Sequence, residues 1–202
     1  MTQTLKKEIF DTDNISDYYK KYYKSQNKFK PIVLNYVFRN ISFITKKEKI
    51  RTITHSEYKE ISICLNIPIM LIHKVISEYL INLLRFKKFL NKNPNLLHIK
   101  EQKHFINILI HRFYRLAPVF DYKRAKQNAK ILQIKLNKLF FWPQLMTQLA
   151  IIIFVTDLFD KQNSQKIIQS NLRALCSCSA YAFHRTRNKL GLTSKFAKSL
   201  TA

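Results

Sequence analysis

The sequence predicts an all-α fold, and three observations support this prediction. Apolar residues recur at spacings of three and four along most segments from residue 31 onward, which places them on one helix face. Capping signals stand where such segments begin, as in Thr54-His-Ser-Glu57. The 202 residues include 47% apolar residues, enough for a buried core, and a single glycine, Gly191.

Residues 1–30 are predicted to form a flexible basic and aromatic arm. Pairs of tyrosines and lysines alternate there in the run Tyr-Tyr-Lys-Lys-Tyr-Tyr-Lys over residues 18–24. Such a run is suited to stacking on bases and lying along phosphates. It is equally typical of a solvated tail that docks on a partner or on the body of the protein, so both interpretations stay open.

A helical subdomain is expected over residues 31–100. Val33 and Val37 share one helix face after Pro31, which suits a first helical position, although β-branched neighbours leave a strand open. A short helix follows the Thr54 cap, and Pro68 separates it from a longer helix that runs to about residue 90. This short helix, turn and long helix have the order of a helix-turn-helix, which we interpret mainly as structural.

A second helical domain is expected over residues 101–202. Its first helix spans 104–116, and Asp121 caps the next. The helix after Pro143 is apolar nearly all round, so it is expected at the centre of the core.

Two further helices are expected near the C-terminus. One runs from about Gln165 to Leu175, and the last from Ala180 to Leu190, with Ser177 or Ser179 as its N-cap. Gly191 follows the last helix at the position where a left-handed residue closes a helix.

The order of motifs over residues 104–191 resembles the second cyclin-like repeat of transcription factor IIB. The residues that carry the resemblance are Arg112-Phe-Tyr-Arg-Leu116, Asp121 with Arg124-Ala125 and Ala129, Trp142-Pro143 with 149–153, Ser164-Gln-Lys-Ile167, and Ser177-x-Ser179 before His184-Arg-Thr-Arg187. The resemblance implies a five-helix cyclin-like domain ending in a helix-turn-helix at about 164–191, with residues 31–100 as a possible degenerate first repeat. No cysteine precedes Cys64, so these residues carry no zinc ribbon of that family.

If this resemblance holds, the last helix is a recognition helix. Arginine pairs with guanine and asparagine with adenine in the major groove. A lysine stripe on the helix after Asp121 offers a second basic surface, although such a stripe is usually only solvated. The candidate nucleic-acid-binding residues are Lys123, Lys126, Lys130, Lys166, Arg173, His184, Arg185, Arg187, Asn188, Lys189 and Lys195.

The charge favours a polyanionic partner. Thirty-six Lys and Arg face 12 Asp and Glu, for a formal net charge of +24, and nucleic acid is the commonest partner of such a chain. An AT-rich coding sequence, which enriches lysine, is the alternative explanation.

One glycine leaves no Walker A loop and no dinucleotide fingerprint. No catalytic motif is present, so we expect neither an enzyme nor a cofactor.

The cysteines favour a reducing compartment. Cys64, Cys176 and Cys178 lack disulfide-framework spacing, so we expect a reducing compartment. For a DNA-binding protein we expect this to be the nucleus, with another reducing intracellular compartment, including an organelle, as the alternative. Cys176, Cys178 and His184 offer at most three ligands where structural zinc takes four, so no metal is expected. The most apolar run, residues 149–155, is far shorter than the roughly 20 residues of a membrane span.

These observations lead to three functional hypotheses. The first is a non-catalytic accessory subunit that grips duplex DNA and serves a partner enzyme complex in transcription or DNA modification. The second is a cyclin-like protein-interaction module whose charge is incidental. The third is a basic RNA-binding component of a ribonucleoprotein.

Overall fold

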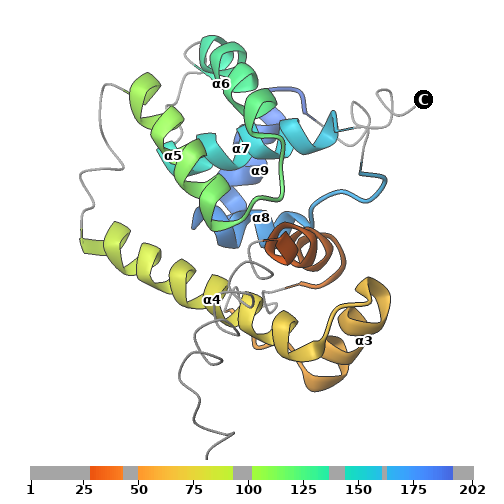
Figure 1. Cartoon of the computed structure of the whole chain (residues 1–202). Coiled ribbons are helices and arrows are strands. Elements are labelled where there is room, and N and C mark those ends of the chain that lie inside the picture. The colour runs from red at the N-terminus through yellow and green to blue at the C-terminus, as the bar shows by residue number, and fades with distance from the viewer. Residues whose placement is uncertain (1–27, 43–49, 93–101, 137–143, 161–162, 193–202) are drawn as a thin grey trace, which may run out of the picture.

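The computed structural model describes residues 28–42, 50–92, 102–136, 144–160 and 163–192. Over these ranges the chain forms eight helices and no strand, which confirms the all-α prediction. The helix over residues 28–40, called helix 28–40 below, is followed by α3 (His55–Leu65) and α4 (Ile69–Lys92). The remaining helices are α5 (Gln102–Leu116), α6 (Tyr122–Leu136), α7 (Leu145–Leu158), α8 (Gln169–Cys176) and α9 (Ala180–Lys189) (Figure 1).

Local capping sets several of these boundaries as the sequence predicts. Thr54 and Glu57 form a complete capping box at the start of α3. Asn66, in the left-handed conformation at φ 50°, ends α3 before Pro68. The Asp121 carboxylate accepts a hydrogen bond from the Arg124 amide at 3.0 Å and so caps α6. Local hydrogen bonds therefore fix where these helices begin and end.

Two predicted helix starts differ from the structure. Helix 28–40 is already helical at residue 28, so Pro31 stands within its first described turn rather than at its first position. Proline is tolerated there because the first amides of a helix have no intrahelical acceptor. α7 begins at Leu145, while Pro143 lies outside the described residues.

α7 occupies the centre of the C-terminal helices, as its apolar composition predicts. Twelve of its fourteen residues are buried, and it packs against α5, α6, α8 and α9 (Figure 1). Because a helix that is apolar all round has no face for solvent, surrounding helices must cover every side of it.

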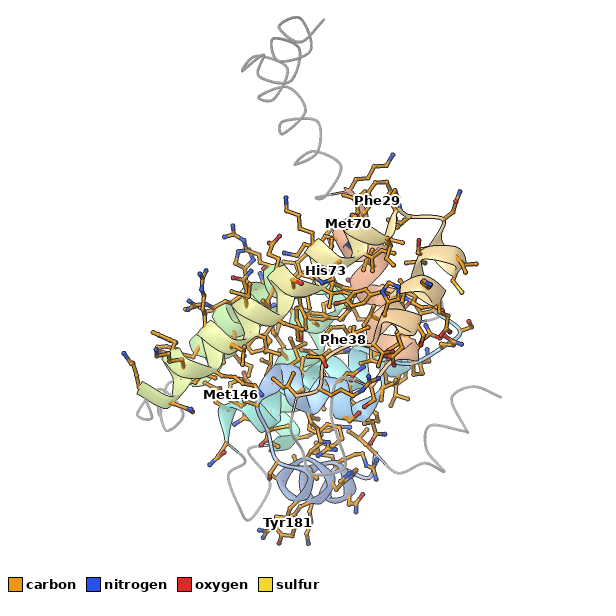
Figure 2. The ribbon with its side chains drawn as sticks, turned by 90° about the horizontal axis from the view of Figure 1, so that it is seen from below. Phe29, Phe38, Met70, His73, Met146 and Tyr181 are labelled. Carbon is orange, nitrogen blue, oxygen red and sulfur yellow. The ribbon has the colours of Figure 1, made fainter. Side chains whose placement is uncertain are left out.

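The hydrophobic core is continuous across both halves of the chain. One cluster of buried side chains runs from Val33 to Leu192. Within it the ring of Phe38, labelled in Figure 2, meets the ring of Tyr79 edge to face at 5.4 Å, which packs helix 28–40 against α4. The domain boundary predicted near residues 91–100 falls largely on 93–101, outside the described residues.

A buried ion pair joins helix 28–40 to α7. Arg39 Nη1 lies 2.7 Å from Asp157 Oδ1, and both side chains are 4% exposed. The same guanidinium donates to the Asn35 side chain at 2.8 Å, to the Gln165 carbonyl at 2.6 Å and to the Val119 carbonyl at 3.2 Å. Burial raises the pKa of Asp157, opposed by Arg39 and by the hydrogen bond from the Ile167 amide.

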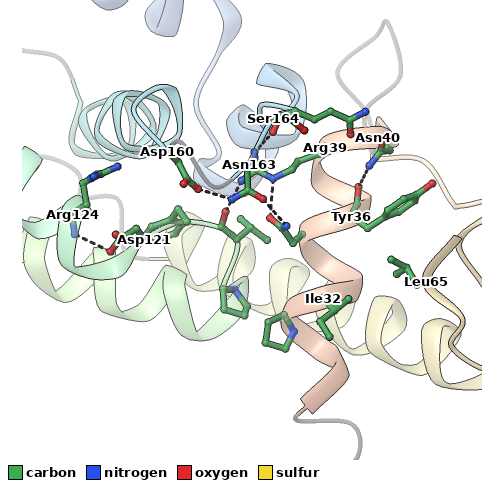
Figure 3. A pocket seen from close by; sticks show the side chains of 16 residues that line it. Ile32, Tyr36, Arg39, Asn40, Leu65, Asp121, Arg124, Asp160, Asn163 and Ser164 are labelled. Atoms are coloured by element: carbon green, nitrogen blue, oxygen red, sulfur yellow. Dashed lines mark hydrogen bonds between the residues drawn. The ribbon is translucent and has the colours of Figure 1, made fainter. Parts of the chain in front are cut away.

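Arg39 also forms part of the wall of a groove of about 840 Å³ beside helix 28–40. Asn35 and Asn163 hydrogen-bond across this groove at 3.1 Å, and Asn163 in turn donates to Asp160 (Figure 3). The polar groups of the groove are thus largely bonded to one another, and they tie helix 28–40 to the segment between α7 and α8.

Breaking the buried ion pair should cost far more stability than breaking an exposed one. We expect Arg39→Met to lower the free energy of unfolding by about 3–5 kcal/mol, because it leaves the Asp157 carboxylate buried without its cation. Urea unfolding at pH 7 measures the difference. Glu78→Gln is the control, because it removes the 3.6 Å pair with Lys30 from a side chain that is 47% exposed. That variant should lose less than about 1 kcal/mol, and equal losses would contradict the expectation.

The α3 capping box should make stability depend on pH in acid. Hydrogen bonds from Arg51, at 2.6 and 2.9 Å, are the largest cause that lowers the pKa of Glu57 from 4.5 to about 2. Because the folded pKa lies below the unfolded one, the stabilisation is complete above about pH 4.5 and is lost as the pH falls towards 2.

Urea unfolding of the wild type and of Glu57→Gln from pH 7 to 2 tests this dependence. The difference between the two proteins should be constant near neutrality and shrink below pH 4.5. Arg51→Gln should remove most of the same dependence. A difference that stays constant down to pH 2 would show that the Glu57 charge does not stabilise the fold.

Candidate nucleic-acid interface

The segment before α8 is not helical, which corrects the predicted start of that helix at about Gln165. α8 begins at Gln169. The Gln165 carbonyl accepts from Arg39, and the Ile167 amide donates to Asp157 Oδ2 at 2.7 Å. If the helix began at Gln165, this carbonyl and this amide would belong to its first turn. Here they are hydrogen-bonded to the buried ion pair instead.

Helix 28–40 also holds α8 directly. The Asn171 side-chain amide donates to the carbonyls of Phe38 and Ile41 at 3.0 and 2.7 Å, and the Ile168 amide donates to Phe38 as well. The last carbonyls of a helix have no intrahelical donor. α8 therefore supplies the donors that the end of helix 28–40 needs, and its position follows from that helix.

A three-residue turn connects α8 to α9. Ser177 takes the left-handed conformation at φ 51°, and the Cys178 amide donates back to the Arg173 carbonyl. Ser179, one of the two serines predicted as the N-cap, accepts from the Ala182 amide at 3.1 Å. Gly191 closes α9 at φ 72°, as the sequence predicts. These local contacts fix the direction of α9.

α9 presents one face to α7 and the opposite face to solvent. Phe183 and Thr186 are buried, and the Phe183 ring meets Phe154 of α7 edge to face at 5.6 Å. At 3.6 residues per turn, residues 181, 185, 188 and 189 then lie on the outer side. All four are exposed: Tyr181, Arg185, Asn188 and Lys189.

Tyr181 is a surface residue that sequence reasoning missed. It is 73% exposed and projects from α9 at the opposite end of the view from Phe29 and Met70 (Figure 2). The Arg185 guanidinium lies 6.0 Å from the centre of its ring. Its spacing of four from Arg185 could have placed Tyr181 on the same outer face of the helix. An aromatic residue two positions before Phe183, however, is also typical of the edge of the core.

Three other predicted residues, Arg173, His184 and Arg187, lie close together where α9 meets α8. Arg187 donates to the side chains of Gln169 and Asn188, each at 3.4 Å. His184 is partly buried, and burial lowers its pKa below 6.5, with further lowering by Arg187 and Arg173. The structure thus places Arg173 of α8 and His184 and Arg187 of α9 close enough to interact electrostatically.

Some of the predicted lysines are exposed to solvent, whereas Lys166 forms hydrogen bonds within the protein. Lys123, Lys126 and Lys130 are exposed on α6, and the Lys126 ammonium lies 5.2 Å from the Tyr122 ring centre. Lys166 instead donates to the carbonyls of Asp160 and Asn163 at 2.7 and 3.1 Å, so it stabilises the segment before α8. Lys195 lies outside the described residues.

Comparisons with protein-family models, with curated proteins and with solved structures give no match to this chain. Within the part of the chain that the structure describes, no three His, Cys, Asp or Glu side chains gather to hold a metal ion. No single helix there is both long and apolar enough to cross a membrane, and α3 and α4 have that length and composition only as a pair bent by 115°.

The charge of Arg187 should depress the pKa of His184. We expect Arg187→Ala to raise that pKa towards, but not to, 6.5, because burial and Arg173 remain. NMR titration of the imidazole C–H signals measures the value. Arg185→Ala is the matched control, because Arg185 points to solvent and should leave the value unchanged. Equal shifts in both variants would contradict this arrangement.

Proposed function

We propose that the chain is a non-catalytic DNA-binding accessory subunit that grips duplex DNA through α8 and α9. α9 acts as the recognition helix, and α8 with its three-residue turn holds α9 against the body of the protein. The outer face of α9 carries this proposal: Tyr181, Arg185, Asn188 and Lys189 are all exposed on it. No acidic residue occurs anywhere in residues 163–192.

The chemistry of this face suits the major groove. Recognition helices contact base edges mainly through the residues near their N-terminus, which here include Tyr181, and Arg185 follows one turn later on the same face. A guanidinium pairs bidentately with guanine, and the Asn188 amide suits adenine. The buried Phe183 and Thr186 fix the helix rotation, so these outer side chains are presented together.

The helix order also supports a cyclin-like domain. α5 to α9 give five helices, and the third of them, α7, is the buried central one. α8, the turn at 177–179 and α9 then correspond to the helix-turn-helix that the resemblance implies.

α6 supplies a second basic surface that would contact phosphates without reading bases. Its exposed Lys123, Lys126 and Lys130 come from a helix that carries no acidic residue. Both α6 and α9 pack on α7, so one rigid helix positions both. Phosphate contacts of this kind set orientation and salt dependence.

The accessory role rests on exposed apolar side chains on α4. Met70, Ile81 and Leu84 are 72%, 49% and 56% exposed at spacings of eleven and three, which places them on one side of the helix. A partner of the same nuclear complex would cover them and supply the catalysis. These side chains also favour the second candidate function, a protein-interaction module, which predicts partner binding without affinity for duplex DNA.

Removing two charges from the outer face of α9 should weaken duplex binding and flatten its salt dependence. Each lost phosphate contact reduces the slope of log K against log salt by about 0.9. We expect Arg185→Ala with Lys189→Ala to reduce the slope by about 0.9 through the lost Lys189 phosphate contact. The lost guanine contact of Arg185 should weaken binding further at every salt concentration. Fluorescence anisotropy with a labelled 20-base-pair duplex at 50 to 200 mM salt measures both.

The control has to remove the same charge elsewhere. Lys59→Ala with Lys88→Ala removes two exposed lysines from α3 and α4 and should leave the slope nearly unchanged. An unchanged slope in the α9 variant, or an equal reduction in both variants, would refute recognition by α9. A structured RNA hairpin bound more tightly than the duplex would favour the ribonucleoprotein role instead.

A further inference from the structure

A pocket between α4 and α5 combines three arginines with an aromatic surface. Its volume is about 340 Å³, and the residues that matter here are Asn82, Arg85, Phe86, Phe89, Arg112 and Arg115. They come from two segments about 25 residues apart, which only the packing of α4 against α5 brings together. The pocket shares no residue with the candidate interface on α6, α8 and α9.

Arg112 lies over the aromatic surface of this pocket. Its guanidinium carbon is 5.4 Å from the ring centre of Phe86 and 5.2 Å from that of Phe89. Phe86 is fixed edge to face against Phe113 at 5.0 Å, whereas Phe89 remains 40% exposed. These cation–π contacts hold the Arg112 guanidinium beside a flat apolar surface, so a planar group can pack against the guanidinium and Phe89 together.

The arginines of the pocket have no counter-charge among the described residues. Arg85, Arg112 and Arg115 are exposed, and no acidic residue lines the pocket. Within the described ranges none of the three makes an ion pair or a hydrogen bond. Arg39 and Arg51, in contrast, are each paired with a carboxylate. A structural ion-pair network therefore does not account for these three charges.

We infer that this pocket binds one nucleotide of an unpaired nucleic-acid strand. Arg85 and Arg115 would hold its phosphate, and its base would stack against Arg112 and Phe89. An unpaired strand suits the pocket better than a duplex, because the faces of its bases are available for stacking. Simple phosphate binding would make no use of the phenylalanine surface. The chain thus holds a single strand at a site separate from α9.

The test uses the full chain and a 12-residue oligothymidylate with a 5′ fluorescein label, followed by fluorescence anisotropy. Base stacking contributes enough that Arg112→Ala should bind about tenfold more weakly. Arg112→Lys keeps the charge but loses the flat surface, so it should remain at least about threefold weaker than the wild type. Arg85→Ala with Arg115→Ala should reduce the salt slope by about 1.4, at 0.7 per phosphate contact of a single strand.

Matched controls separate this pocket from diffuse charge and from α9. Lys88→Ala with Lys92→Ala removes two exposed lysines of α4 that do not line the pocket and should bind like the wild type. The Arg185→Ala, Lys189→Ala variant should also retain binding of the oligonucleotide, so failure at α9 and failure at the pocket are distinguishable. A thermal unfolding midpoint within about 2 °C of the wild type confirms that each variant is folded.

Four results would overturn the inference. The first is no binding of the oligonucleotide by the wild type at 50 mM salt. The second is wild-type affinity in Arg112→Lys, which would show that only the positive charge of Arg112, and not its flat surface, contributes to binding. The third is an equal loss in the Lys88, Lys92 control. The fourth is displacement of the oligonucleotide by a phosphotyrosine peptide at lower concentration than by unlabelled oligonucleotide, which would assign the pocket to a protein partner.

Discussion

The buried ion pair between Arg39 and Asp157 determines where the C-terminal helices lie. Removing two charges from water costs several kcal/mol per ion unless hydrogen bonds replace the lost hydration. Here the guanidinium reaches four acceptors, and the carboxylate also accepts from the Ile167 amide. Satisfying both charges requires helix 28–40, the loop before α6 and the segment before α8 to meet at one point.

The position of α9 follows from this meeting point through α8. The carbonyls at the end of helix 28–40 accept from Asn171 and Ile168, so the start of α8 is fixed to a segment more than 120 residues earlier. The turn at Ser177 then directs α9 onto α7, where Phe183 packs against Phe154. Arg39, a buried residue far from α9 in the sequence, thus helps to orient the outer face of α9.

Local features of the fold could be predicted from the sequence, whereas long-range ones could not. The Thr54 box, the Asp121 cap and Gly191 depend on residues within four positions of one another, so the pattern alone determines them. A charge such as Asp157, two residues after the apolar run 149–155, signals a buried partner. The sequence offers 36 cations as that partner, and only the packing selects Arg39.

The same distinction holds for the candidate sites. Helical periodicity after the Ser179 cap suffices to predict that Arg185 and Asn188 share a face. Periodicity could not show that the Lys166 ammonium donates to the carbonyls of Asp160 and Asn163, because those contacts depend on the non-helical segment before α8. The arginine pocket could not be predicted either, because residues 82–89 and 112–116 become neighbours only when α4 packs on α5.

The placement of the few acidic residues argues that the basic surface is more than a product of composition. The second half has four acids, and the three that the structure describes are each used internally. Asp157 pairs with Arg39, Asp121 caps α6, and Asp160 accepts from Asn163.

A drift towards lysine in the coding sequence explains the number of cations, but it does not explain why these acids are bound into the fold. Because these acids are used in this way, the positive charges on α6, on α9 and in the arginine pocket repel one another. A bound polyanion would relieve that repulsion and stabilise the folded state by mass action.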